Sequence, residues 1–343
     1  MPRRLSRSLA VALLALGCGE GDGRTPLVLY SPHGPDQLGA LEKAFEARNP
    51  DIDVRWLDMG SQDVFDRVRS ERANPQADVW FGGPTTIFDR GVADSLLQPY
   101  RPDWAARVGP RGVGPADLYW PVYRTPAVIA FNAKAVPRDS APRDWDEVLL
   151  PKWKDQVLIR DPMASGTMRA IWGYIIYRGI QAGGDTTQGM AWLRRLDAQT
   201  RAYVLSPLLL TEKLARQEGL VTLWDLPDVL IDRGRGLPLD YHFPSSGTVV
   251  IDDAIGLVRG ARHVPAAQRF IDWVASDEAL LLAARVTFRL PARADLPKDS
   301  VPPWIADVES RMHEAPMDWA LLARDGPGWM AYWDQRVRGT GKK

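Results

Sequence analysis

Residues 157–176 read VLIRDPMASGTMRAIWGYII, a short apolar run, a polar turn and a longer apolar run. This pattern is typical of a buried strand that passes through a tight turn into a helix. Ser165 or Thr167 can cap that helix with a side-chain oxygen, and Gly166 allows a close approach of the backbone. The N–H groups and the positive dipole end of the helix would then face one point, which favours an anion. An ordinary capped helix that binds nothing is the alternative interpretation.

The alternation of strand and helix patterns continues on both sides of this stretch. Before it, apolar runs predict strands and periodic runs predict helices, at residues 27–30, 36–48, 52–57, 63–72 and 77–81. After it, residues 189–199 and 208–217 predict helices, and residues 220–224 predict a strand. Repetition of this unit predicts an α/β fold with mixed, mostly parallel sheets and helices on both faces.

Two long apolar runs, residues 125–132 and 249–258, are predicted as two strands that cross between lobes. We therefore assign residues 27–130 together with 249–343 to a first lobe and residues 131–248 to a second lobe. A body of about 315 residues is large enough for two such domains, each with its own core.

The segment after the second crossing is predicted to be helical. Residues 265–285 have the apolar periodicity of one amphipathic helix. Residues 302–333 are rich in tryptophan and also predict helix, which we expect to pack against the first lobe. The sequence contains no internal repeat, low-complexity tract or heptad run.

The N-terminus has the pattern of a secretory signal. Three arginines precede the apolar residues 9–17, a run too short to span a bilayer as a mature helix, so residues 1–17 are excluded from the fold. Cys18 follows directly and resembles the lipid-modified cysteine of bacterial lipoproteins, with plain cleavage or an uncleaved anchor as the alternatives. The polar residues 18–26 predict a tether. We expect an exported protein at the periplasmic face of the cell envelope, lipid-anchored at Cys18.

Composition excludes several classes of function. Without residues 1–17 the chain has 40 basic and 43 acidic residues, a net charge near −3 that does not point to nucleic acid. The single cysteine, Cys18, rules out an internal disulfide, so stability must come from core burial. No residue pattern calls for a metal or another cofactor.

Hydroxyl-bearing residues and glycines recur in the turns that follow predicted strands. In α/β sheets a ligand binds in the crevice outside the carboxyl ends of the strands, so two facing lobes would surround one small molecule with these turns. The predicted ligand-binding residues are Ser31, His33, Gly34, Ser61, Gly83, Thr85, Ser165, Gly166, Thr167, Trp224 and Asp225.

Together these motifs resemble the substrate-binding proteins of bacterial ABC importers, in the ferric-iron, thiamine and phosphonate-type group. The resemblance covers residues 27–293 and is carried by residues 29–34, 77–83, 161–167, 244–248 and 266–276. It implies a periplasmic-binding-protein-like fold of type II, with a two-strand hinge and a ligand clamped between the lobes. It also implies a permease of the inner membrane as partner; we expect the protein itself to be a monomer.

Ferric-iron members of the group hold the metal with adjacent tyrosines after the strand that matches residues 220–224. Here that stretch continues as Asp225-Leu226-Pro227-Asp228, without a tyrosine pair. His33 stands near a metal-binding histidine of some iron members, or it is a hydrogen-bonding loop residue. Asp225 and Asp228 either meet a ligand ammonium group or a metal, or they cap a helix.

The sequence therefore predicts a non-enzymatic solute-binding lipoprotein that captures a small anion with a phosphate or phosphonate group. Arg124 and Arg160 can supply the paired N–H donors that suit such an anion, although solvated arginines are the default. One alternative is a ferric-iron-binding protein of the same family. The other is an exported hydrolase, which the absence of a Gly-x-Ser-x-Gly elbow and of metal-spaced histidines opposes.

Overall fold

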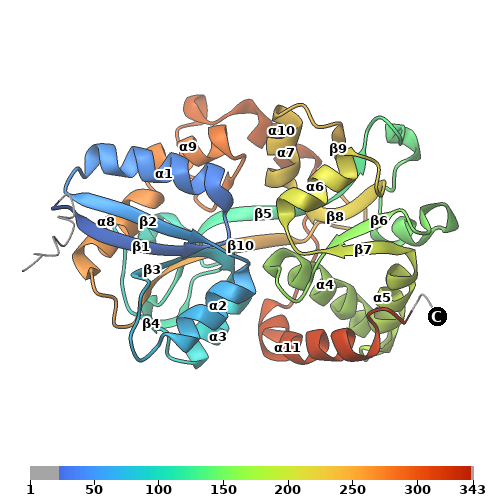
Figure 1. Ribbon diagram of the computed structural model, residues 1–343, viewed down its shortest axis with the longest axis horizontal. Coiled ribbons are helices and arrows are strands. Elements are labelled where there is room, and N and C mark those ends of the chain that lie inside the picture. Colours follow the sequence, from blue (N-terminus) through green and yellow to red (C-terminus); the bar gives the residue numbers. More distant parts are fainter. Residues whose placement is uncertain (1–22, 341–343) are drawn as a thin grey trace, which may run out of the picture.

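The computed structural model describes residues 23–340, so the predicted signal and Cys18 lie outside the described residues. Its strands form one continuous mixed sheet that extends across the molecule (Figure 1). From one edge to the other, the strands are β2 (Ile52–Asp58), β1 (Thr25–Ser31), β3 (Val79–Pro84), β10 (Val250–Val258), β5 (Trp120–Asn132), β8 (Val221–Asp225), β6 (Val157–Arg160) and β7 (Thr200–Val204).

The sheet has a parallel part at each end and antiparallel strands between them. β1 runs parallel to β2 and β3, and β6 runs parallel to β7 and β8. β10 and β5 are antiparallel to their neighbours, and three short strands pair beside them: β4 (Leu97–Gln98), β9 (Leu239–His242) and β11 (Leu290–Pro291). We call the region around β1–β3 the first half and the region around β6–β8 the second half.

β5 joins the two halves by changing partners along its length. Residues from Trp120 to Pro126 pair with β10, whereas residues from Ala127 to Asn132 pair with β8 and β9. The predicted crossings at residues 125–132 and 249–258 correspond to β5 and β10. The change of partners in β5 falls between Pro126 and Ala127, a few residues before the predicted boundary at residue 130. The division into lobes at residues 130 and 249 stays a prediction.

Helices cover both faces of the sheet in each half (Figure 1). Those of the first half are α1 (Gly34–Arg48), α2 (Ser61–Ser70), α3 (Thr85–Ala93), α8 (Val264–Val274) and α9 (Asp277–Val286). Those of the second half are α4 (Gly166–Gly183), α5 (Thr187–Gln199), α6 (Pro207–Ala215) and α7 (Leu226–Gly234). The predicted α/β class is confirmed. Within residues 23–340, no helix has the length and apolar character needed to cross a bilayer.

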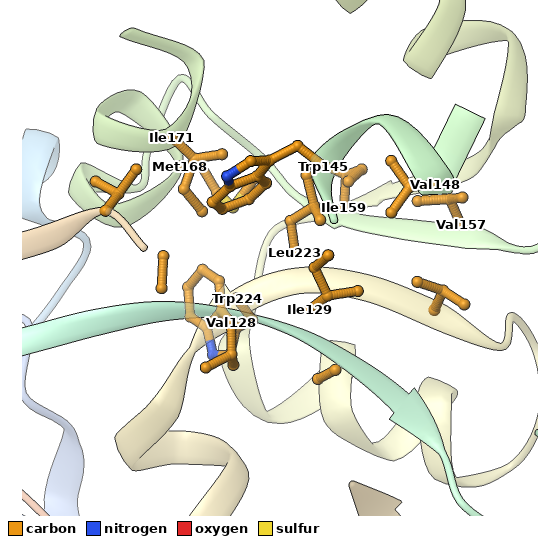
Figure 2. Close-up of a cluster of buried hydrophobic side chains, with 14 of the residues drawn as sticks. Val128, Ile129, Trp145, Val148, Val157, Ile159, Met168, Ile171, Leu223 and Trp224 are labelled. Carbon is orange, nitrogen blue, oxygen red and sulfur yellow. The ribbon is translucent and has the colours of Figure 1, made fainter. Parts of the chain in front are cut away.

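The core of the second half explains why residues 157–176 fold as a strand and a helix. Ile159 of β6 and Ile171 of α4 are fully buried beside Ile129 of β5 and Leu223 of β8 (Figure 2). Each such side chain contributes about 1.5–3 kcal/mol by leaving water. α4 then ends where Gly184 adopts a left-handed conformation with φ +85°, which a glycine tolerates at no steric cost.

The single helix predicted at residues 265–285 is wrong, because the chain forms α8 and α9 instead. α8 ends at Val274, and Ser276 caps α9 by accepting a hydrogen bond from the Ala279 N–H at 3.3 Å. A serine whose side chain competes for backbone N–H groups interrupts a helix in spite of continued apolar periodicity.

The sequence predicted that the C-terminal segment packs against the first half. In the structure it contacts both halves. It forms α10 (Pro303–Arg311) and α11 (Trp319–Arg336), and α11 contacts both α3 and α4. Val308, Met330 and Trp333 belong to the buried core of the second half. In Figure 1, α11 lies along the second half and reaches toward α3. Aromatic composition signals burial here, but does not identify the surface that is covered.

Candidate functional site

The starts of several helices lie around one cavity between the two halves. α1, α2, α4 and α7 each begin shortly after the carboxyl end of a strand, which brings their first turns to the same edge of the sheet. The cavity has a volume of about 70 Å³. Its lining comprises Pro32, His33, Gly60, Ser61, Pro84, Thr125, Arg160, Ser165, Thr167, Pro207, Trp224, Asp225, Asp228, Asp253 and Arg289.

Many of the residues predicted from the turns lie on this cavity. These are His33, Ser61, Ser165, Thr167, Trp224 and Asp225. One water molecule needs roughly 10–15 Å³ of cavity volume, so a cavity of about 70 Å³ has room for a small solute. Their role in binding stays a prediction.

The other predicted residues lie beside the cavity. Ser31 is buried at the end of β1, where its hydroxyl accepts the backbone N–H two residues on at 3.2 Å. Gly34 and Thr85 begin α1 and α3. Gly83 donates its N–H to a carboxylate of β10 at 3.2 Å, and Gly166 lines a smaller space between α3, α4 and α11.

Ser165 and Thr167 play different parts at the start of α4. The Ser165 hydroxyl caps the helix by accepting the Met168 N–H at 3.2 Å. Thr167 stands in the first turn, is partly buried and faces the cavity. The first N–H groups of a helix have no partner within it, so this end of α4 can bind an anion.

The start of α7 supplies a pair of carboxylates. Asp225, which is 6% exposed, caps α7 by accepting the Asp228 N–H at 3.1 Å. Asp228 accepts the Trp224 Nε1–H at 2.9 Å. Burial, followed by the charge of Asp228, raises the pKa of Asp225 well above its ordinary value. Burial also raises the pKa of Asp228. The predicted helix cap is therefore present, but the burial of its carboxylate disfavours the charged form of Asp225.

Asp253 and Arg289 also line the cavity, and the sequence interpretation missed both. Asp253 of β10 accepts hydrogen bonds from the Thr125 hydroxyl and the Gly83 N–H. Arg289 donates to Gln37 Oε1 at 2.7 Å and to Thr125 Oγ1 at 3.3 Å. The available signal was a charged residue within an apolar run, since Asp253 lies in the buried strand β10 and Arg289 directly precedes Leu290.

Arg160 lies on the cavity, whereas Arg124 does not. Arg160 is 5% exposed, and its Nε has no hydrogen-bond partner in the described part of the chain. Burial lowers the pKa of Arg160 from its ordinary value near 12.5, which leaves the group charged at neutral pH. Arg124 instead pairs with Glu314 at 3.4 Å. Of the two arginines predicted from the sequence, Arg160 is thus the one that a ligand in the cavity could contact.

His33 is buried on the same cavity in its neutral form. It is 8% exposed, and its ring lies edge-on to Phe81 with the centroids 4.6 Å apart. Within residues 23–340 neither ring nitrogen has a hydrogen-bond partner. Burial, followed by the charge of Arg289, lowers the pKa of His33 well below 6.5. The described residues also contain no group of three or more His, Cys, Asp or Glu side chains arranged to hold a metal ion.

The two halves touch one another around the cavity. The Gln62 N–H of α2 donates to the Ala164 carbonyl at 3.3 Å. Asp36 of α1 forms an ion pair with Arg235, which follows α7. A Cβ atom on Gly166 would lie only 2.5 Å from Pro84 Cδ, so the absence of a side chain permits this approach. These contacts hold the walls of the cavity together.

Comparisons with known proteins agree with this arrangement. A family model described as bacterial extracellular solute-binding protein matches residues 83–308. A putative 2-aminoethylphosphonate-binding periplasmic protein of Salmonella typhimurium is 26% identical over 309 residues, which cover 85% of this chain and 86% of the relative. A probable ABC transporter periplasmic-binding protein of Sinorhizobium fredii is 23% identical over 340 residues, or 98% and 93% of the two chains.

The fold is also that of a solved periplasmic binding protein. AfuA from Actinobacillus pleuropneumoniae, solved with exogenous fructose-6-phosphate bound, superposes with a TM-score of 0.82 at 22% identity, over 93% of this chain and 100% of that one. At this identity the likeness shows the fold alone, and it confirms the predicted periplasmic-binding-protein fold.

The matched family comprises proteins that bind solutes for transport and are not catalysts, so the hydrolase alternative is set aside. The family model covers well over half of the sequence, and the relatives match along most of their own length. The chain belongs to the bacterial extracellular solute-binding proteins.

Proposed function

We propose that this protein is the solute-binding component of an ABC importer and that it captures a small anionic solute with a phosphate or phosphonate group. The observation that carries the proposal is the start of α4, where Thr167, the helix N-terminus and the buried Arg160 face one small cavity. A helix N-terminus and a guanidinium group both favour an anion. The 2-aminoethylphosphonate-binding relative supports a phosphonate group.

The remaining predictions from the sequence belong to the same proposal. The two lobes, divided at residues 130 and 249, close on the solute and present it to a permease of the inner membrane. Cys18 carries a lipid that tethers the monomeric protein to the periplasmic face of the envelope. The contacts between α1, α2 and the second half support closure, because each would break if the halves moved apart.

A thermal-unfolding screen tests the proposed ligand class. Inorganic phosphate, ethylphosphonate, 2-aminoethylphosphonate and ferric citrate are each added to the purified protein, with citrate alone as the control. A ligand at about 100 times its Kd stabilises the native state by about 2.7 kcal/mol, so a phosphonate is expected to raise the melting temperature by several degrees. A rise with ferric citrate and with none of the anions would favour the ferric-iron alternative.

Thr167→Val is expected to weaken binding of the anion by about fivefold to tenfold, because it removes one hydroxyl at nearly constant volume. The melting temperature of the unliganded protein should stay the same. Ser165→Ala is the informative comparison, since loss of this cap costs about 0.5–2 kcal/mol of stability whatever it does to binding. Titration calorimetry and thermal unfolding of both variants separate the two roles. Unchanged affinity in Thr167→Val would remove this hydroxyl from the site.

A further inference from the structure

The cavity holds charged groups of both signs that do not neutralise one another in pairs. Asp225, Asp228 and Asp253 line it together with Arg160 and Arg289. Within residues 23–340 none of these side chains forms an ion pair closer than 4.0 Å, although ion pairs are frequent elsewhere on the protein. Burying charge without a partner is costly, so a ligand that completes the pairing would be strongly favoured.

An anion alone would complete only part of this pairing. The anion would neutralise Arg160 at the start of α4. Because Asp228 lies within electrostatic range of Arg160, the anion would also bring a further negative charge close to Asp228. The acidic groups on the cavity exceed the arginines by one. The charge of Arg289 acts on Asp225, Asp228 and Asp253 alike, so the wall formed by Asp225 and Asp228 would gain from a further positive charge.

We infer that the solute carries a cationic amino group, bound by Asp225 and Asp228, as well as the anionic group at Arg160 and Thr167. This inference rests on the proposed function and narrows its ligand class to small zwitterions. Within the described chain, Asp225 uses one oxygen for the Asp228 N–H, and Asp228 uses one for the Trp224 indole. Each carboxylate thus keeps an oxygen for an ammonium group, which has three N–H donors.

A separate observation supports a polar ligand in the space beside these carboxylates. His33 and Arg160 are both more than nine-tenths buried and line the same cavity. The two ring nitrogens of His33 and the Nε of Arg160 have no partners among the described residues. Buried polar atoms are almost always hydrogen-bonded in native proteins, so polar groups of a solute in this cavity would satisfy these three atoms.

Helix capping alone does not explain the acidic pair. Asparagine caps a helix about as well as aspartate, and it carries no charge into a buried site. The carboxylate of Asp228 is favoured by the positive end of the helix dipole, by about 0.3–1 kcal/mol, but its charge also repels that of Asp225. The small cavity of about 70 Å³ requires a short spacer between the amino group and the anionic group.

The test uses three pairs of ligands that differ in the presence of an amino group. The pairs are 2-aminoethylphosphonate and ethylphosphonate, 2-aminoethanesulfonate and ethanesulfonate, and 3-aminopropionate and propionate. Titration calorimetry on the purified protein at pH 7.5 measures each affinity. At least one amino ligand is expected to bind about 30-fold or more tightly than its partner, the effect typical of pairing a buried charge.

Asp228→Asn is expected to lower the affinity for that amino ligand about 30-fold or more and to change the affinity for its partner less than about threefold. The fold should tolerate this substitution, because the amide oxygen of asparagine can still accept the Trp224 indole N–H. Asp318→Asn, at the start of α11 and outside the cavity lining, is the control and should leave both affinities unchanged.

Each outcome separates the two proposals. Equal affinities within every pair that binds, with no effect of Asp228→Asn, would overturn the amino-group inference and leave the anion proposal intact. Absence of binding by all six ligands would overturn this inference, and absence of binding by inorganic phosphate as well would overturn the anion proposal. Binding of an amino ligand that Asp228→Asn leaves unchanged would assign the amino group elsewhere and overturn the role of Asp225 and Asp228.

Discussion

Replacing Gly166 with alanine is expected to weaken solute binding by about tenfold or more and to leave the unliganded protein fully stable. The new Cβ would lie 2.5 Å from Pro84 Cδ and 2.9 Å from Ser61 Oγ, across the boundary between the halves. A proline ring cannot move aside by rotating, so the halves must separate. Loss of the closed contacts would reduce affinity by about 1.4 kcal/mol or more, which is a factor of ten.

The same substitution at Gly39 provides the control for Gly166→Ala. Gly39 also lies in a helix, and a Cβ there would meet no atom of residues 23–340 within 4 Å. Both substitutions favour helix formation slightly, so neither should lower the melting temperature. Affinities from titration calorimetry should fall for Gly166→Ala and stay unchanged for Gly39→Ala. Equal affinities in the two variants would show that close contact at Gly166 is not needed for binding.

Asp225→Asn is expected to stabilise the unliganded protein while it impairs binding of an amino ligand. Asparagine retains the cap of α7, whereas the buried charge of Asp225, which has no ion-pair partner within residues 23–340, is removed. The expected gain at neutral pH is about 1–3 kcal/mol in the free energy of unfolding, measured by urea denaturation. A residue kept for stability would show the opposite sign, since binding sites retain groups that destabilise the empty fold.

The gain from Asp225→Asn should depend on pH in a defined direction. The pKa of Asp225 is raised in the folded state above its ordinary value of 3.8, so its charge destabilises the fold at pH values above the raised pKa. This penalty shrinks as the pH falls through the raised pKa and is gone below 3.8, where the carboxyl is protonated in both states. The difference between wild type and variant should therefore shrink on acidification.

Asp318→Asn is the matched control for this measurement. Asp318 caps α11 by accepting the Leu321 N–H at 2.8 Å, but it is exposed. Its replacement should change stability by less than about 0.5 kcal/mol at any pH. If Asp225→Asn behaves like Asp318→Asn, the carboxylate of Asp225 does not carry the cost that burial implies.

Local sequence signals predicted the strand, the turn and the helix at residues 157–176 correctly. The apolar run before Arg160 is buried in β6, and Ser165 caps α4 as its type and position suggested. The signal was sufficient because capping and apolar periodicity act over a few neighbouring residues. The same reasoning was wrong at residues 265–285, where Ser276 interrupts a continuous pattern.

The composition of the site was less accessible. His33, Ser165 and Asp225 were recognised because they follow strands, and the carboxyl ends of strands share one edge of a sheet. Asp253 and Arg289 come from the middle of β10 and from a loop after α9. Asp253 reaches the cavity because β10 pairs with β5, and Arg289 reaches it because the next residue, Leu290, begins β11, which also pairs with β5.

By itself, the sequence determined the α/β class and the family, because these features depend on local periodicity and short motifs. It also predicted a turn suited to an anion. Only the tertiary structure decided that, among the described residues, the carboxylates of Asp225 and Asp228 line one cavity with Arg160 without an ion pair, and that α11 packs against both α3 and α4. Charge pairing and contact between distant segments depend on distances in space, which spacing along the chain does not fix.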